Sequence, residues 1–166
     1  MKYSIALVAI LVLSAFLFQA SFAQATASQN LTLAVNTVYK IATSGNPGAL
    51  TITTGTAGTD ALTSVSDNST TYSMTQNFGN TVKITANLDA ALASGYTLQI
   101  NMASTKGTSA GTVDISNATS GSAATVVNAI NKGAESGQAI TYTFSALASA
   151  GTLSSTAKVV TLTLTN

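Results

Sequence analysis

The chain has 166 residues and contains no cysteine, histidine or tryptophan, and arginine is also absent. Without cysteine there is no disulfide, so a folded domain must gain its stability from burial, backbone pairing or assembly. Without histidine or cysteine, the softer metals lose their usual ligands, and nucleophile activation by a Cys-His or Ser-His-Asp arrangement is excluded. Because arginine is missing and the net charge is only +1, the chain has no electrostatic footprint for nucleic-acid binding.

Proline and charged residues are scarce as well. Pro47 is the only proline, and charged residues make up 7% of the chain. A disordered, glycosylated stalk would be rich in proline and poor in aliphatic residues. Here threonine and serine alternate with valine, isoleucine and leucine, as they do in half-buried strands. The composition therefore predicts a folded β domain.

The first 23 residues have the pattern of a secretory signal peptide. Lys2 precedes an apolar run over residues 5–13, and Ser21-Phe22-Ala23 places small residues where signal peptidase requires them. The apolar run is too short to predict a helix that spans a bilayer. We expect cleavage after Ala23, no membrane span in the mature chain, and a secreted protein that is extracellular or held at the cell surface.

Apolar and polar residues alternate along most of the remaining chain. The predicted strands are residues 31–35, 38–41, 50–52, 72–74, 82–88, 96–102, 113–115, 140–146 and 160–164. The β-branched residues in 123–130 favour a strand over a helix, and residues 87–94 are expected to form a short helical turn. The pattern predicts an all-β fold, a two-sheet antiparallel β-sandwich of the Ig-like or pilin-like kind, with about 8–10 strands.

The alternation also predicts which side chains form the core. The inward-facing set is Leu50, Ile52, Val82, Ile84, Leu98, Ile100, Ile115, Tyr142, Phe144, Leu162 and Leu164. Tyr39, Tyr72 and Tyr96 lie on predicted strands, where we expect them to pack rather than to form an exposed binding platform.

The acidic residues are scattered, with no close pair for acid-base chemistry and no Asp-x-Asp-x-Asp run for calcium. Asp60, Asp67 and Asp114 lie beside turn-forming residues, so we expect them to bind nearby backbone amides. The chain is accordingly predicted to be no enzyme, with no cofactor and no metal site.

Three asparagines begin N-glycosylation sequons: Asn30, Asn68 and Asn117. They are candidate glycosylation sites only if the host glycosylates its secreted proteins. The Thr-x-Thr pairs, such as Thr161 and Thr163, are expected to form the outward half of amphipathic strands, and an ice-binding ladder is the less favoured reading.

The two ends of the mature chain suggest a role in assembly. An N-terminal extension (24–43) contains Leu31, Leu33 and Val35 in alternation and is separated by small residues from a β-sandwich domain (44–166), which ends in a strong strand. Such an extension can add a β-strand to the open edge of another subunit.

These features resemble the subunits of secreted β-sandwich filaments that assemble by donor-strand complementation, as in chaperone-usher pilins and related pili. The chain lacks the cysteine pair and the C-terminal aromatic residue of chaperone-usher pilins, and it has no sorting motif after Leu164. The resemblance implies a structural subunit of an extracellular filament, pilus or surface matrix.

In this interpretation the protein partners itself as a homopolymer, and the assembly contacts neighbouring cells or matrix. Leu31, Leu33 and Val35 form the donor strand, which inserts into the neighbouring subunit. The alternative interpretation is a monomeric secreted adhesin or carbohydrate-binding β-sandwich module.

Overall fold

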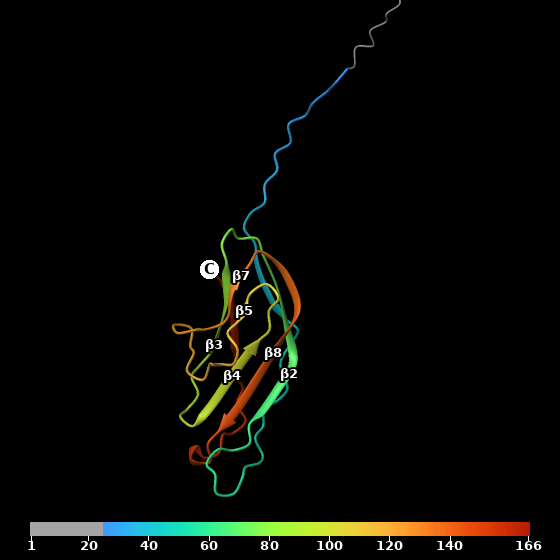
Figure 1. The fold of residues 1–166 in the computed structure, drawn as a ribbon. Coiled ribbons are helices and arrows are strands. Elements are labelled where there is room, and N and C mark those ends of the chain that lie inside the picture. Colours follow the sequence, from blue (N-terminus) through green and yellow to red (C-terminus); the bar gives the residue numbers. More distant parts are fainter. Residues whose placement is uncertain (1–24) are drawn as a thin grey trace, which may run out of the picture. The chain divides into compact units, whose positions relative to one another are not determined.

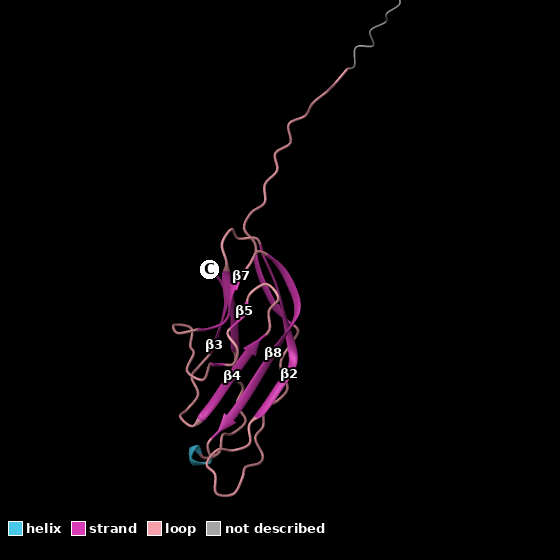
Figure 2. Cartoon of the chain, viewed as in Figure 1, coloured by secondary structure: helices cyan, strands magenta, loops and turns pink. Residues whose placement is uncertain are grey.

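The computed structural model describes residues 25–166, so the predicted signal peptide lies outside the described residues. The chain divides into two units, residues 1–35 and 36–166. The second unit contains every strand of the described chain. Figure 2 shows strands joined by loops in this unit, and its one helical element is a short 3-10 turn, η1 (Ala148–Ala150).

Within residues 25–166, nine strands form two antiparallel sheets, which confirms the predicted β-sandwich. The five-stranded sheet has the order β1 (Tyr39–Thr43), β2 (Val65–Gln76), β8 (Gly133–Ala146), β4 (Tyr96–Met102) and β6 (Val113–Asp114). The four-stranded sheet has the order β5 (Thr108–Ser109), β7 (Ala124–Ile130), β3 (Val82–Leu88) and β9 (Val160–Thr165). Figure 1 shows the sheet with β2, β8 and β4 beside the layer with β3 and β7.

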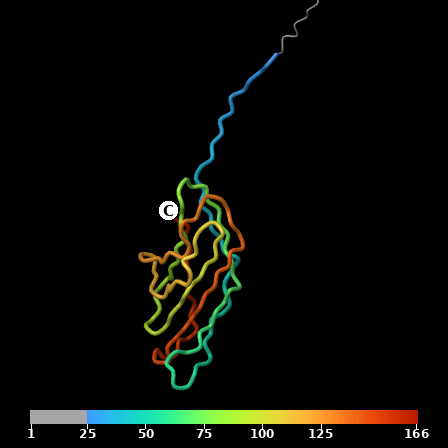
Figure 3. The backbone as a smooth tube through the Cα atoms, viewed as in Figure 1, coloured from blue at the N-terminus to red at the C-terminus, as the bar shows by residue number. Residues whose placement is uncertain are grey.

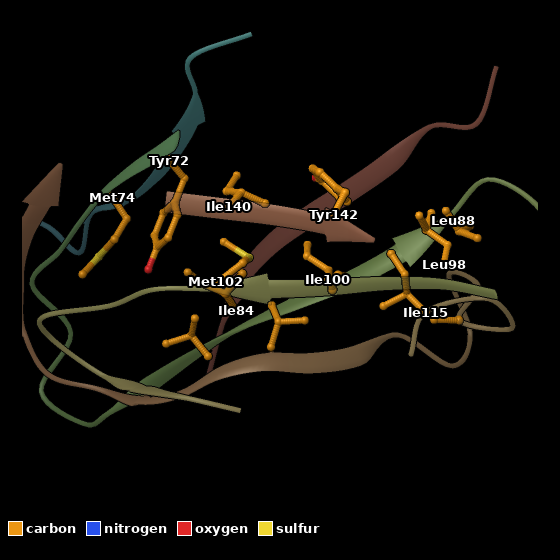
Figure 4. Packing of buried hydrophobic residues seen from close by; sticks show 14 of the residues in the cluster. Tyr72, Met74, Ile84, Leu88, Leu98, Ile100, Met102, Ile115, Ile140 and Tyr142 are labelled. Atoms are coloured by element: carbon orange, nitrogen blue, oxygen red, sulfur yellow. The ribbon is translucent and has the colours of Figure 1, made fainter. Parts of the chain in front are cut away.

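The core lies between the two sheets, and side chains from both layers point into it (Figure 4). Strict alternation accounts for β3, in which Val82, Ile84, Ala86 and Leu88 are buried and the residues between them are not. The predicted core residues on β3, β4, β8 and the loop after β6 are buried: Val82, Ile84, Leu98, Ile100, Ile115 and Tyr142. Four others are partly buried and pack against the cluster: Leu50, Phe144, Leu162 and Leu164.

Three local predictions are corrected by the structure. Residues 50–52 form no strand, although Leu50 packs on the core. The edge of β2 is not available to them, because it is occupied by β1 and by Ser44, whose amide donates to the Thr71 carbonyl at 2.9 Å. Residues 87–94 form no helical turn, because their amides bond outward, as Leu92 does to the Ser116 carbonyl at 2.8 Å. Residues 31–35 form no strand within the described chain.

The sandwich begins earlier than residue 44. Residues 39–43, which the sequence assigns to the N-terminal extension, pair with β2 as β1, in a register that joins Tyr39 to Gln76 and Thr43 to Tyr72. The ambiguous segment 123–130 forms β7, a strand, as its β-branched residues predict. The part of the chain outside the sandwich therefore ends at Val35.

The sandwich has two distinct ends. At one end β1 begins, β2 ends at Gln76, β3 begins at Val82 and β9 ends at Thr165, which pairs with Lys83. We call this the Asn77 end, after the residue that follows β2, and Figure 1 shows the C-terminus there. At the far end, the connection over residues 44–64 meets η1 (Figure 3), where the Ala148 amide donates to the Asp60 carbonyl at 2.7 Å.

Candidate functional site

The described part of the N-terminal unit, residues 25–35, is extended and carries its apolar side chains in the open. Leu31, Leu33 and Val35 are 79%, 82% and 87% exposed. No ladder includes them among the described residues. Exposing three large aliphatic side chains in alternation is costly in water, and burying each would contribute about 1.5–3 kcal/mol.

The sandwich has four edge strands, and they differ in how well they are protected. β5 and β6 are two residues long, which is one of the usual ways to blunt an edge. β1 carries a charge at Lys40. β9 has six residues and neither charge nor proline, and it pairs with β3 without a register shift. Among the residues that the structure describes, β9 is thus the long, regular and unprotected edge.

The side chains of β9 are incompletely covered. Val160, Leu162 and Leu164 face the interior, opposite Leu88, Ala86 and Ile84 of β3. Their partners on β3 are fully buried, whereas these three are only partly buried. β1 contacts β9 across the sandwich, so the uncovered side chains of β9 lie where the edges of both sheets come together.

The two segments have matching patterns. Residues 31–35 carry apolar side chains at three alternate positions, and residues 160–164 do the same. Neither segment is charged, so no like-charge repulsion opposes their pairing. Among residues 25–166, the apolar segment 31–35 pairs with no strand, and β9 pairs only with β3, which leaves its other edge without a ladder.

The carboxylates serve the fold rather than a shared site. Each of the five accepts a hydrogen bond from a backbone amide: Asp60 from Ser149, Asp67 from Ser69, Asp89 from Val159, Asp114 from Ser116 and Glu135 from Thr105. The Ser69 hydroxyl and amide, outweighing slight desolvation, also hold the pKa of Asp67 below its ordinary value. The predicted amide binding by Asp60, Asp67 and Asp114 is confirmed, and residues 25–166 contain no cluster of three potential metal ligands.

Glu135 is the one carboxylate that sequence reasoning missed as a structural centre. It is 7% exposed, and its oxygens accept from the Tyr72 hydroxyl at 2.8 Å and from the amides of Thr105 and Lys106 at 2.7 and 3.0 Å. Burial raises the pKa of Glu135, but these bonds and those from the Ser104 hydroxyl outweigh it and leave the pKa lowered. The sequence held one sign of this role. Glu135 is the only glutamate of the chain, and it lies between Gly133 and Gly137 in a strand.

The aromatic residues offer little exposed surface. Tyr72 and Tyr96 are buried, as predicted, and their hydroxyls bind the carbonyls of Ala103 and Ala150. Burial raises the pKa of Tyr72 and of Tyr142. Tyr39 is partly buried against Phe78, with ring centroids 5.7 Å apart. An exposed tyrosine platform for a sugar is therefore absent at residues 72 and 96.

The remaining predicted positions lie on the surface. Asn30, Asn68 and Asn117 are exposed, which is compatible with glycosylation. The hydroxyl of Thr70, in the Asn68 sequon, is buried without a hydrogen-bond partner. On the outer face of the smaller sheet, Thr163, Thr85 and Thr125 lie side by side. This is one row of threonines, and the next rows contain Asn87 and Lys83.

Comparisons with known proteins give no guide to the site: no family model, no curated protein and no solved structure matches the chain. Among residues 25–166 no helix has the length and apolar character needed to cross a membrane.

Proposed function

We propose that this protein is a secreted structural subunit that polymerises into an extracellular filament or surface matrix. Residues 31–35 of one copy add a strand to the free edge of β9 in the next copy. The observation that carries the proposal is the match between two uncharged segments with the same alternation, the exposed donor with Leu31, Leu33 and Val35 and the partly buried edge strand β9. Strand addition satisfies the free backbone groups of such an edge.

The direction of the added strand follows from the sheet. Every ladder of the sandwich is antiparallel, and antiparallel addition to β9 continues that pattern. With Leu33 opposite Leu162, Leu31 lies opposite Leu164 and Val35 opposite Val160. The three donor side chains then face the interior beside the partly buried residues of β9.

The same direction gives the filament a polarity. The donor segment joins its own domain at the Asn77 end, since it precedes β1. In antiparallel addition, Val35 lies at the far end of the acceptor, where β9 begins. The Asn77 end of each subunit therefore meets the far end of the next, and all subunits point the same way. A heterologous contact of this kind propagates as a fibre wherever the rotation between successive subunits does not close it into a ring.

The free energy gained by burying the donor side chains and the free energy lost by ordering the donor backbone are of similar size. Burying three aliphatic side chains contributes roughly 5–8 kcal/mol, and ordering five backbone residues costs about 1–2 kcal/mol each. The main-chain ladder must supply the surplus. Because the margin is narrow, we expect one disrupted donor side chain to abolish assembly.

The test compares residues 24–166 with three variants: a deletion of residues 24–35, Leu33→Asp, and the matched control Thr32→Asp. Thr32 neighbours Leu33, and in the proposed pairing its side chain points to the outer side of the sheet rather than into the interior. Negative-stain images and sedimentation should reveal filaments of the unaltered chain and of Thr32→Asp, and only folded monomers of the other two. Monomers in every case, with reproducible binding on a glycan array, would favour the alternative, a monomeric adhesin.

A further inference from the structure

Asn77 binds the backbone at the point where the N-terminal segment joins the sandwich. Its side-chain oxygen accepts from the Val38 amide at 2.7 Å, and its side-chain nitrogen donates to the Asn36 carbonyl at 2.9 Å. Its own amide donates to the Val38 carbonyl at 3.3 Å. One exposed residue thus makes three hydrogen bonds to two residues that lie 39 to 41 positions earlier in the chain.

These bonds end the ladder between β1 and β2. The register that pairs Tyr39 with Gln76 would next pair Val38 with Asn77. In a continuing antiparallel ladder, Val38 would donate to the main-chain carbonyl of Asn77. The Val38 amide donates to the side-chain oxygen of Asn77 instead. The side-chain nitrogen of Asn77 donates to the Asn36 carbonyl, which would otherwise accept from a main-chain amide further along. The ladder ends because the Asn77 side chain takes the place of the main-chain partners of the Val38 amide and the Asn36 carbonyl, while the Asn77 amide keeps its bond to the Val38 carbonyl.

The neighbours of Asn77 hold it in place. Gln76 is 1% exposed, and its side chain makes two hydrogen bonds. The side-chain nitrogen donates to the Ile130 carbonyl at 3.3 Å, and the side-chain oxygen accepts from the Phe78 backbone amide at 2.7 Å. The Phe78 ring packs on Tyr39. Both residues that flank Asn77 are therefore fixed to other elements, while Asn77 itself is exposed and can be replaced without opening the core.

We propose that Asn77 is a positioning residue for assembly, which ends intrasubunit pairing at Val38 and holds residues 36–38 in the conformation from which the donor segment leaves its domain. The inference rests on the proposed function. Fixing the root of the donor in the free subunit removes part of the ordering cost from the assembly step. Asn77 also prevents the donor segment from continuing the ladder with β2 of its own subunit. The acceptor edge of a second copy is then the available partner.

The test uses Asn77→Ala, which removes both side-chain bonds, and Asn77→Asp, which keeps the acceptor for Val38 and loses the donor to Asn36. Asn117→Ala is the matched control, because Asn117 is exposed and its side chain makes no hydrogen bond in the described chain. The critical concentration for filament formation, measured by sedimentation, should rise about tenfold for Asn77→Ala. It should rise less for Asn77→Asp and remain unchanged for Asn117→Ala.

Hydrogen exchange gives a readout that does not need filaments. In the Leu33→Asp background, Asn77→Ala should speed exchange at the Val38 amide and leave the amides of β3 unchanged. Filaments of the unaltered chain with an unchanged critical concentration for Asn77→Ala would overturn this inference and leave the proposed function standing. Absence of filaments from the unaltered chain would overturn both.

Discussion

The Tyr72 hydroxyl lies 2.8 Å from a carboxylate oxygen of Glu135 in the interior of the sandwich. A register shift between β2 and β8 creates this contact: Tyr72 pairs with Gln138, but Met74 pairs with Glu135, so β8 contains one extra residue there. The extra residue reverses the alternation and turns Glu135 inward. The carboxylate then holds the loop over residues 104–106 through four donors, the Ser104 hydroxyl, the amide and hydroxyl of Thr105 and the Lys106 amide.

We expect Glu135→Gln to lower the free energy of unfolding by about 2–3 kcal/mol, because hydrogen bonds to a buried charged group are lost and an amide nitrogen would face backbone donors. Urea unfolding of the deletion that lacks residues 24–35 measures it without interference from assembly. Asp67→Asn is the control, since the hydrogen bonds that Asp67 accepts from Ser69 are exposed to solvent, and its effect should be smaller. Equal effects would contradict a special role for Glu135.

The same carboxylate should make stability depend on pH in acid. The pKa of Glu135 is lowered in the folded protein, against about 4.3 in an unfolded chain. Its stabilisation is therefore complete above the unfolded value and is lost as the pH falls through the folded value. The difference in Tm between the unaltered protein and Glu135→Gln should be full at pH 7 and shrink below about pH 4. A constant difference down to pH 2.5 would contradict this account.

The bulge itself can be tested at Gly137, which adopts a φ of +64°. An L-residue in this left-handed conformation costs about 1–2 kcal/mol, so Gly137→Ala should destabilise the domain by about that amount in thermal unfolding. Gly121→Ala is the control, because Gly121 has an ordinary φ and no neighbour near an added Cβ. Equal Tm values for the two variants would show that the bulge tolerates a side chain.

Much of the sandwich could be predicted from alternation, and the exceptions have a physical cause. Extrapolated back from Ile140, the alternation of β8 places Glu135 on the outer face, and only the bulge reverses it. Val126 and Val127 are adjacent and both buried, beside a register shift between β3 and β7. A bulge depends on the partner strand as well as on local sequence, so single-sequence periodicity cannot locate it.

The candidate site was predictable in part. The alternation of residues 31–35 is plain in the sequence, and so is the apolar strand over residues 160–164. Which edges of the sandwich remain free depends on the strand order, which the sequence does not give. The role of Asn77 depends on a register between residues far apart in the chain, which alternation within one segment does not reveal.

The acceptor edge predicts a contrast between two neighbouring residues of β9. Leu162 faces the interior and is partly buried, whereas Thr163 faces outward and is exposed. Leu162→Ala should raise the critical concentration for assembly at least tenfold, because the lost contact with the donor is worth about 1.5 kcal/mol or more. Thr163→Ala should leave it nearly unchanged. Sedimentation measures both, and equal behaviour of the two variants would move the acceptor site away from β9.

Disulfide trapping tests the central claim most directly, because the chain has no cysteine of its own. In the proposed register the outward-facing residues Thr32 and Ala34 lie opposite Thr163 and Thr161, at the Cα separation that a disulfide spans. We predict that oxidised Thr32→Cys/Thr163→Cys and Ala34→Cys/Thr161→Cys each give a ladder of covalent multimers on a non-reducing gel. Bonds formed only within single chains, or only in the pairs Thr32→Cys/Thr161→Cys and Ala34→Cys/Thr163→Cys, would contradict antiparallel strand donation between copies.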